Sequence, residues 1–142
     1  MKIECSIEKI KNAVSQVERI TGKNLTLPIL NCILLIASGK SLKLRSTNLS
    51  LGIEIEIPAK IEKEGVLAIP GMVFNAIFSN ISQNENISLE GKNGNLLIKT
   101  KKTQIKLKSQ PHEDFPTIPK VVGKSFGIES KKLIEGIKSV YY

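Results

Sequence analysis

Positively charged side chains are the most numerous groups in this sequence that could act on a partner. The 142 residues include 21 Lys and Arg against 13 Asp and Glu, a formal net charge of +8 at pH 7. Such a surplus favours a polyanionic partner, either nucleic acid or an acidic membrane surface. Only Arg19 and Arg45 are arginines, and lysine suits diffuse phosphate contacts better than bidentate contacts to guanine. We therefore expect phosphate attraction without sequence-specific DNA readout.

Groups that could catalyse a reaction or hold a metal are scarce. His112, the single histidine, stands beside Glu113 and Asp114 in a proline-bearing connector, with no second histidine or nucleophile placed to join them. Cys5 and Cys32 form no C-x-x-C pair, so neither a zinc site nor a disulfide framework is expected. No glycine-rich phosphate loop or nucleophile motif occurs. The sequence predicts a protein that is not an enzyme and uses no metal or cofactor.

The first predicted helix separates an apolar face from a polar one. Its apolar residues follow helical spacing at Ile7, Ile10, Val14 and Val17. The opposite face carries Asn12, Ser15, Gln16 and Arg19, with Lys9 and Lys11 at its flanks. Ser6 and Glu8 predict a capped, acidic start, and Gly22 predicts the end of the helix. The polar face is a candidate contact for DNA phosphates, and the alternative is an ordinary solvated surface.

The remaining pattern predicts strands around two helices. Period-two alternation predicts strands over residues 2–6, 41–46 and 51–58, each with one wet face. Further strands are expected over 29–37, 66–69, 86–90, 95–100 and 103–109, and a second helix after Pro70-Gly71. Residues 91–94 predict a hairpin turn. This order predicts an α+β fold, because the helices are too few and too separated for parallel βαβ units.

No segment predicts export or membrane insertion. The N-terminus carries acidic residues where a signal peptide needs a continuous apolar stretch. The most apolar run, residues 27–37, is interrupted by Pro28 and Asn31 and is far shorter than the roughly 20 residues of a membrane helix. We interpret it as a buried strand and expect a cytoplasmic protein without a membrane partner.

Residues 126–140 repeat the apolar pattern of residues 3–17. The matched pairs are Ile3 and Phe126, Cys5 and Ile128, Ile10 and Leu133, Val14 and Ile137, and Val17 and Val140. A shared helical period can also produce such matches by chance, so the repeat is a hypothesis. If it is real, the chain passes through the connector at 110–123 into a second strand and helix, which Tyr141-Tyr142 interrupts.

Four short motifs carry a resemblance to a known family. They are Thr26-Leu-Pro-Ile-Leu30, the turn Ser46-Thr47-Asn48-Leu49, the helix start Ile69-Pro70 and the connector Glu113-Asp114-Phe115-Pro116. In this order and spacing they resemble the first domain of the bacterial DNA sliding clamp, the beta subunit of DNA polymerase III. The resemblance implies a first clamp domain over 1–121, and over 122–142 a connector and the truncated start of a second domain.

The resemblance also implies a fold and a function. Members of the family have three similar domains per chain, and two full-length chains form a homodimeric ring around duplex DNA. Helices line the DNA-facing side of antiparallel sheets, in a strand–helix–strands unit that occurs twice per domain. The ring acts in DNA replication as a processivity factor: it tethers DNA polymerase III, and a clamp loader places it on DNA. The peptide pocket for these partners is expected outside this chain. The alternative is a stand-alone basic module that binds nucleic acid non-specifically.

Site residues follow from the motifs that match. The resemblance implies DNA contacts for Lys11, Asn12, Gln16 and Arg19 on the first helix, and for Lys23 and Asn24 just before the TLPIL motif. The second helix departs from the family, because Gly71-Met72-Val73 and Ser79 stand where basic residues are common, so its attraction to DNA should be weak. In strand 103–109 the resemblance implies dimer-interface roles for Ile105 and Lys106. The lysines of that strand can also protect an exposed sheet edge against aggregation.

Overall fold

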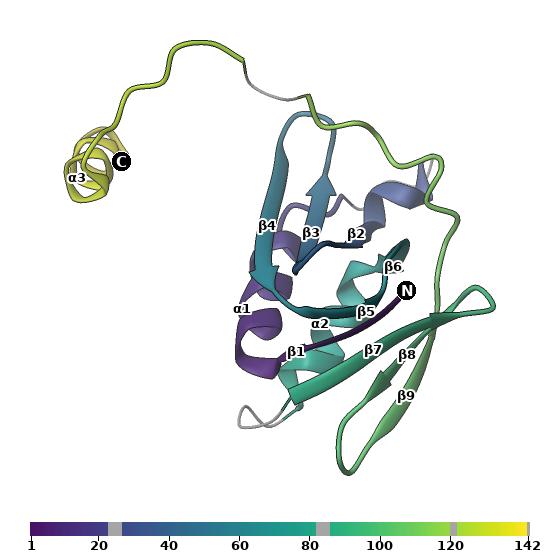
Figure 1. The fold of residues 1–142 in the computed structure, drawn as a ribbon. Coiled ribbons are helices and arrows are strands. Elements are labelled where there is room, and N and C mark those ends of the chain that lie inside the picture. Colours follow the sequence, from purple (N-terminus) through teal and green to yellow (C-terminus); the bar gives the residue numbers. More distant parts are fainter. Residues whose placement is uncertain (23–26, 82–85, 120–121, 142) are drawn as a thin grey trace.

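Alternating apolar and polar residues build most of the strands of this protein. In β3 (Ser41–Thr47), Leu42 and Leu44 are fully buried while Lys43 and Arg45 lie on the other face. A strand places successive side chains on opposite faces, so this period of two buries one face of the sheet. The computed structural model describes residues 1–22, 27–81, 86–119 and 122–141. It confirms the predicted α+β class of antiparallel sheets and helices (Figure 1).

The nine strands of the described residues form two antiparallel sheets. The five-stranded sheet has the order β5 (Lys60–Lys63), β1 (Lys2–Ser6), β7 (Asn86–Lys92), β8 (Asn95–Lys99) and β9 (Gln104–Lys108). The four-stranded sheet has the order β4 (Gly52–Pro58), β3, β2 (Cys32–Ser38) and β6 (Gly65–Pro70). The hairpin predicted over 91–94 is confirmed, but its turn is only Asn93-Gly94, at φ values of +50° and +67°. Two such residues in the left-handed region form the tight turn that suits strand twist.

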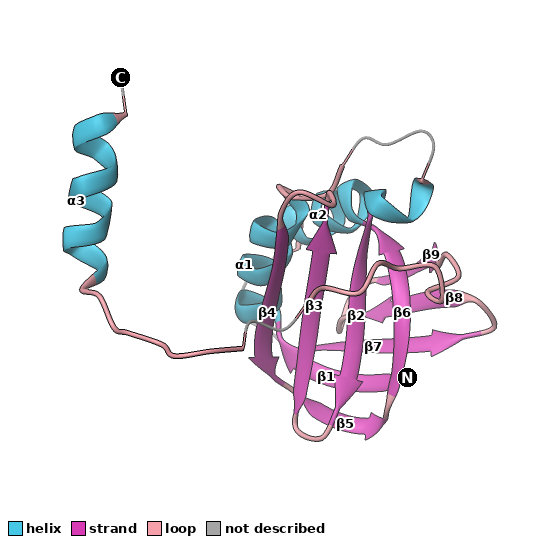
Figure 2. Cartoon of the chain, turned by 90° about the horizontal axis from the view of Figure 1, so that it is seen from above, coloured by secondary structure: helices cyan, strands magenta, loops and turns pink. Residues whose placement is uncertain are grey.

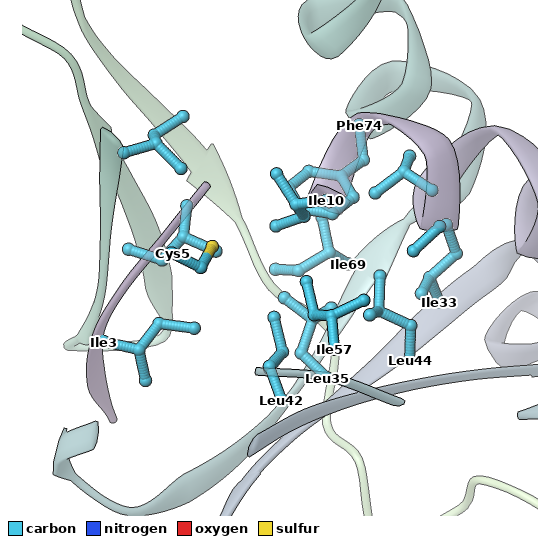
Figure 3. Packing of buried hydrophobic residues seen from close by; sticks show 14 of the residues in the cluster. Ile3, Cys5, Ile10, Ile33, Leu35, Leu42, Leu44, Ile57, Ile69 and Phe74 are labelled. Atoms are coloured by element: carbon cyan, nitrogen blue, oxygen red, sulfur yellow. The ribbon is translucent and has the colours of Figure 1, made fainter. Parts of the chain in front are cut away.

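The main core lies between the two sheets and two helices. It joins Ile3 and Leu89 of the five-stranded sheet to Leu35 and Leu44 of the four-stranded sheet, and all four are at most 1% exposed. Figure 3 shows Ile10 and Phe74, from the two helices, directed into the same cluster. Phe74 and Phe78 meet edge to face with ring centroids 4.8 Å apart. Both rings are fully buried and belong to this core.

Both helices of the domain lie on the same side of the sheets. They are α1 (Ile7–Glu18) and α2 (Gly71–Ser79), which pack against each other (Figure 2). The order β1, α1, β2 to β5 and then β6, α2, β7 to β9 gives the expected strand–helix–strands unit twice. The start of α2 approaches the end of α1 closely, because a Cβ at Gly71 would lie 3.0 Å from Thr21 Cγ2. Glycine at this position therefore permits the contact.

A second, smaller core covers the outer face of the four-stranded sheet. Leu30, Leu34 and Ala68 are buried there, and Phe115 of the connector packs against them. The backbone N–H of Gln110 donates to the carbonyl of Ala68 at 2.8 Å. The connector is thus held to the sheet at two points.

Several predicted element bounds are wrong, each for a local reason. Residues 29–31 are not strand, because Pro28 opens a 3-10 helix over Pro28–Asn31 and β2 begins only at Cys32. The helix α1 ends at Glu18 and not near Gly22, whose N–H donates to Leu30. The expected cap at Ser6 forms no side-chain hydrogen bond, because this residue is the paired last residue of β1.

Of the strand and helix predicted for the repeat over residues 126–140, the structure contains the helix but not the strand. Residues 130–140 form α3 (Ser130–Val140), whose residues are all exposed. Residues 126–128 form no strand, because a strand needs a neighbour to bond and none of the described strands lies beside them. Conversely, β5 was not predicted, since only Ile61 of its four residues is apolar.

Candidate nucleic-acid interface

The outer face of α1 carries the candidate contacts for phosphates. Residues 7, 10, 13, 14 and 17 of this helix are buried, and it packs against β3 and β4. This leaves Asn12, Gln16 and Arg19 exposed, at a spacing of four and three residues that brings them onto one stripe. Glu8 is exposed at the opposite end of the same stripe. The stripe therefore runs from an acidic first turn to a basic end.

Lys11 is directed toward α2 and not outward. Its ammonium group donates to the backbone carbonyl of Ser79 at 3.2 Å, and the side chain is half-buried. Carbonyls in the last turn of a helix lack partners within the helix, and a lysine that bonds one satisfies it. Glu18 also faces α2 and accepts from the Asn75 amide at 3.4 Å. The structure therefore separates Lys11 from the three exposed residues with which it was grouped.

The surface of α2 is uncharged. Its exposed side chains are Met72, Val73, Ala76 and Ser79, and neither its first nor its last turn holds an ionisable residue. An uncharged helix adds no long-range attraction for phosphates. This composition agrees with the weak contribution expected for α2.

Ser46 anchors the end of α1 that carries Arg19. Its hydroxyl is fully buried and donates to the carbonyl of Val17 at 2.5 Å, which joins β3 to the last turn of the helix. Sequence reasoning did not single out Ser46. The available signal was a small polar residue at an inward position, two residues after buried Leu44 in an alternating strand.

The turn between β3 and β4 is closed by its own side chains. The amide oxygen of Asn48 accepts from the N–H groups of Ser50 at 3.1 Å and Leu51 at 2.8 Å. Thr47 Oγ1 accepts from the N–H of Leu49, whose φ of +75° is unusual for an apolar residue. An aspartate at 48 could accept the same two bonds. The geometry of this turn is therefore compatible with either asparagine or aspartate at position 48.

Lys23 and Asn24, the two other predicted DNA contacts, lie outside the described residues. The described chain on either side ends at Gly22 and resumes at Leu27, which is exposed. The stripe on α1 therefore rests on Asn12, Gln16 and Arg19.

The two predicted interface residues lie on a sheet edge. β9 ends the five-stranded sheet and pairs only with β8 among the described strands. Ile105 is half-buried opposite Ile98 and packs against the main core, whereas Lys106 is exposed opposite Leu97. Ile105 and Lys106 thus point to opposite faces of one edge strand. Such an edge offers unpaired backbone groups to another strand.

Other reactive groups are dispersed or inaccessible. Burial raises the pKa of the Cys5 thiol to about 12 and that of Cys32 to about 11. His112 and Glu113 approach to 3.7 Å, but both are exposed in the connector. Among the residues that the structure describes, no cluster of three or more His, Cys, Asp or Glu could hold a metal. No helix in this part of the chain is long and apolar enough to cross a membrane.

Comparison with protein families identifies the domain that these elements form. The family described as "DNA polymerase III beta subunit, N-terminal domain" matches residues 1–119. The beta sliding clamp of Synechococcus elongatus is 25% identical over 145 aligned residues, which cover 100% of this chain and 39% of the relative. The chain thus spans about two fifths of the length of this curated relative.

Solved structures agree in fold. The DNA polymerase III subunit beta of Pseudomonas aeruginosa matches with a TM-score of 0.90 at 24% identity, over 97% of this chain and 38% of that one. The beta clamp of Helicobacter pylori, solved with a bound DNA ligase peptide, matches with a TM-score of 0.78 at 29% identity. That match covers 86% of this chain and 34% of the other. These two matches therefore cover between a third and two fifths of each solved chain.

Proposed function

Because the chain belongs to the DNA polymerase III beta subunit family through its N-terminal domain, we propose that it forms one segment of a sliding clamp. Such a clamp encircles duplex DNA as a ring and keeps the replicative polymerase on its template. The segment itself catalyses no reaction, and the function depends on ring closure more than on affinity. Residues 1–121 supply the first clamp domain, and 122–142 supply the connector and the start of a second.

The observation that carries the proposal is the pair of helices on one side of the sheets. The described part of this side exposes only uncharged residues on α2, and on α1 it exposes Glu8, Lys9, Asn12, Gln16 and Arg19. A ring that slides needs attraction to phosphates without contacts that fix it to particular bases. A sparsely charged helical surface, with two amides, one lysine, one arginine and one glutamate, meets that need. We propose that Lys23 and Asn24 add further DNA contacts.

Lys11 takes a secondary role in this proposal. Its hydrogen bond to Ser79 joins the two helices, so we assign it to holding the DNA-facing layer together. Its positive charge still adds to the electrostatic potential around α1, because the side chain is only half-buried and its partner is an uncharged carbonyl. We therefore expect Arg19→Gln to reduce DNA attraction more than Lys11→Gln, and Lys11→Gln to lower stability slightly.

Ring closure is proposed to use the free edge of β9. Ile105 would extend the main core into the neighbouring domain, and Lys106 would flank the new strand pair on the outer face. A second full-length chain would supply that neighbour in a homodimer. DNA polymerase III and a clamp loader are the further proposed partners, bound outside this segment. These partners imply a cytoplasmic protein.

The test is a chimera in which residues 1–119 replace the matching segment of the Pseudomonas aeruginosa subunit. The chimera is loaded onto nicked circular plasmid with that organism's clamp loader and ATP, and the plasmid is then linearised. We expect gel filtration of the free chimera to show a dimer. On DNA, we expect the chimera to stay on the circular plasmid and to be lost from the ends of the linear plasmid. Equal retention on both DNAs would refute topological binding. A chimera that remains monomeric would refute the assignment of β9.

A further inference from the structure

The densest positive charge of the described chain lies on β7, β8 and β9 and not on the helices. Residues 86–108 contain six lysines and one glutamate, Glu90. We call these lysines the lysine face: Lys92, Lys99, Lys101, Lys102, Lys106 and Lys108. The helix α1 and its cap, residues 7–19, contain three basic and two acidic residues, and α2 contains neither. The charge of the helical layer therefore nearly cancels, while that of residues 86–108 does not.

Strand pairing gathers the lysine face on one side of the sheet. Lys99 pairs with Gln104, Leu97 with Lys106 and Asn95 with Lys108, which puts these side chains on the same face. On the next strand, Lys92 pairs with Asn95 and so continues that face. The opposite face holds Leu96, Ile98 and Leu107, which pack toward the main core. The lysine face therefore points away from the core to which α1 and α2 contribute.

The spacing of these lysines suits a phosphate backbone. Lys106 and Lys108 are two residues apart on one strand, roughly 7 Å, and Lys99 lies diagonally to Lys106 at about the same distance. Lys101 and Lys102 extend the row at the exposed turn between β8 and β9 (Figure 1). From Lys99, opposite Gln104, to Lys108 the row spans about 14 Å along the strands at 3.4 Å per residue, a length that covers several phosphates of one DNA strand.

Most of this charge is not neutralised. Lys99 forms an ion pair with Glu90 at 3.3 Å. No described carboxylate lies within ion-pair distance of the other five lysines, and all five are exposed. Protection of a sheet edge explains lysines on β9 but not Lys92 and Lys99, which belong to the interior strands β7 and β8. The cluster therefore exceeds what edge protection needs.

We propose that the lysine face binds the sugar–phosphate backbone of duplex DNA without sequence preference, as a contact separate from the helical layer. A protein partner is disfavoured because the face lacks an apolar anchor: Leu97 is half-buried and no aromatic residue is present. Bases of single strands would likewise find no ring to stack on. Pairing of another strand with β9 would use backbone groups, so the lysine side chains stay available in a closed ring.

The experiment measures binding of the 142-residue chain to a fluorescein-labelled 30-base-pair linear duplex by anisotropy at several salt concentrations. The variant of the face replaces Lys101, Lys102, Lys106 and Lys108 with glutamine. The matched control replaces four exposed lysines elsewhere, Lys40, Lys60, Lys63 and Lys124. Both variants lose the same net charge, and circular dichroism and urea midpoints verify that they fold as the parent chain does.

We expect the face variant to bind at least tenfold more weakly at 50 mM salt. Each phosphate contact contributes about 0.9 to the slope of log K against log salt, so four lost contacts lower the slope by up to about 3.6. The control should change affinity less than threefold and the slope by less than about 1. Equal losses in both variants would mean that net charge alone acts, and an unchanged face variant would also overturn the proposal.

Two further arms separate this proposal from its competitors. Vesicles with phosphatidylserine test a membrane: if the face variant loses vesicle binding and keeps duplex binding, the DNA proposal falls. Arg19→Gln tests the helical layer: if it abolishes duplex binding while the face variant does not, the lysine face has no such role. A short linear duplex cannot retain a ring topologically, so failure here leaves the proposed clamp function untouched.

Discussion

Replacing Ser46 with alanine tests whether the buried contact between β3 and α1 fixes the end of the helix that carries Arg19. The hydroxyl is fully buried and donates to Val17 at 2.5 Å. Alanine removes the donor and leaves the backbone conformation of β3 undisturbed. The substitution is therefore a specific perturbation of one bond.

The expected cost is about 1 kcal/mol in the free energy of unfolding. A buried hydrogen bond contributes roughly 0.5–1.5 kcal/mol net. The Val17 carbonyl keeps the N–H of Ile20 at 3.2 Å, so no buried acceptor is left without a partner. Loss of one oxygen leaves only a small void, which adds a few tenths of a kcal/mol. The midpoint of thermal unfolding should fall by about 3–6 °C.

Urea unfolding and amide hydrogen exchange measure the two consequences of Ser46→Ala. We expect faster exchange at Ile20 and Thr21, whose N–H groups bond Val17 and Glu18 in the same turn, beyond what the global loss of stability explains. Exposed Ser50 supplies the control, because Ser50→Ala should change stability by less than about 0.5 kcal/mol. A Ser46→Ala protein as stable as the parent, with unchanged exchange in this turn, would refute the anchoring role.

Three further predictions follow from burial and hydrogen bonding. Cys5 and Cys32, whose thiol pKa values burial raises to about 12 and 11, should not react with Ellman's reagent at pH 8 until the chain is unfolded; rapid native reaction would contradict their burial. The Gly39 N–H and a serine hydroxyl hold the pKa of Glu64 below its ordinary value of 4.5. This stabilisation is present above about pH 4.5 and is lost as pH falls through the pKa of Glu64 in the folded state. The urea midpoint of Glu64→Gln should therefore lie below that of the parent chain at pH 7, and the difference should shrink by pH 3. A difference that stays constant between these pH values would contradict the prediction. Phe78→Ala should cost about 3–5 kcal/mol in urea unfolding, because the ring is fully buried; a loss below 1 kcal/mol would refute tight packing there.

Local patterns predicted most of the strands and both helices of the first domain. β3 and β4 follow strict alternation, so their bounds differ from the prediction by one residue. The start of α2 followed from Pro70, whose fixed φ and missing N–H suit a helix start. Both patterns depend only on residues that are close in the sequence, so they predict these elements without knowledge of the fold.

Features that depend on distant partners were not predicted. β1 pairs with β5 and β7, at separations of about 60 and 85 residues, and nothing in its five residues specifies either partner. The charged strand β5 exists because β1 offers it an edge. Similarly, Lys11 was grouped with the polar face by helical spacing, but the carbonyl of Ser79 lies close enough to bind it. Helical spacing predicts the direction in which a side chain leaves the helix, but it does not predict which neighbouring group that side chain will bond.

The distribution of charge is also a feature that local sequence patterns did not predict, and it changes where attraction to DNA is expected. From composition, a net charge of +8 suggested a polyanionic partner, and the resemblance implied DNA contacts on the first helix and just before the TLPIL motif. In the fold, the described helical layer carries almost balanced charge, and strand register collects lysines from β7, β8 and β9 onto the face of the five-stranded sheet that points away from the core. A weakly charged inner layer would hold DNA loosely enough to slide, whereas the outer lysines would attract it at low salt. If both proposals hold, neutralising the lysine face weakens binding to short linear DNA and leaves retention on closed circles intact, because that retention depends on topology and not on charge.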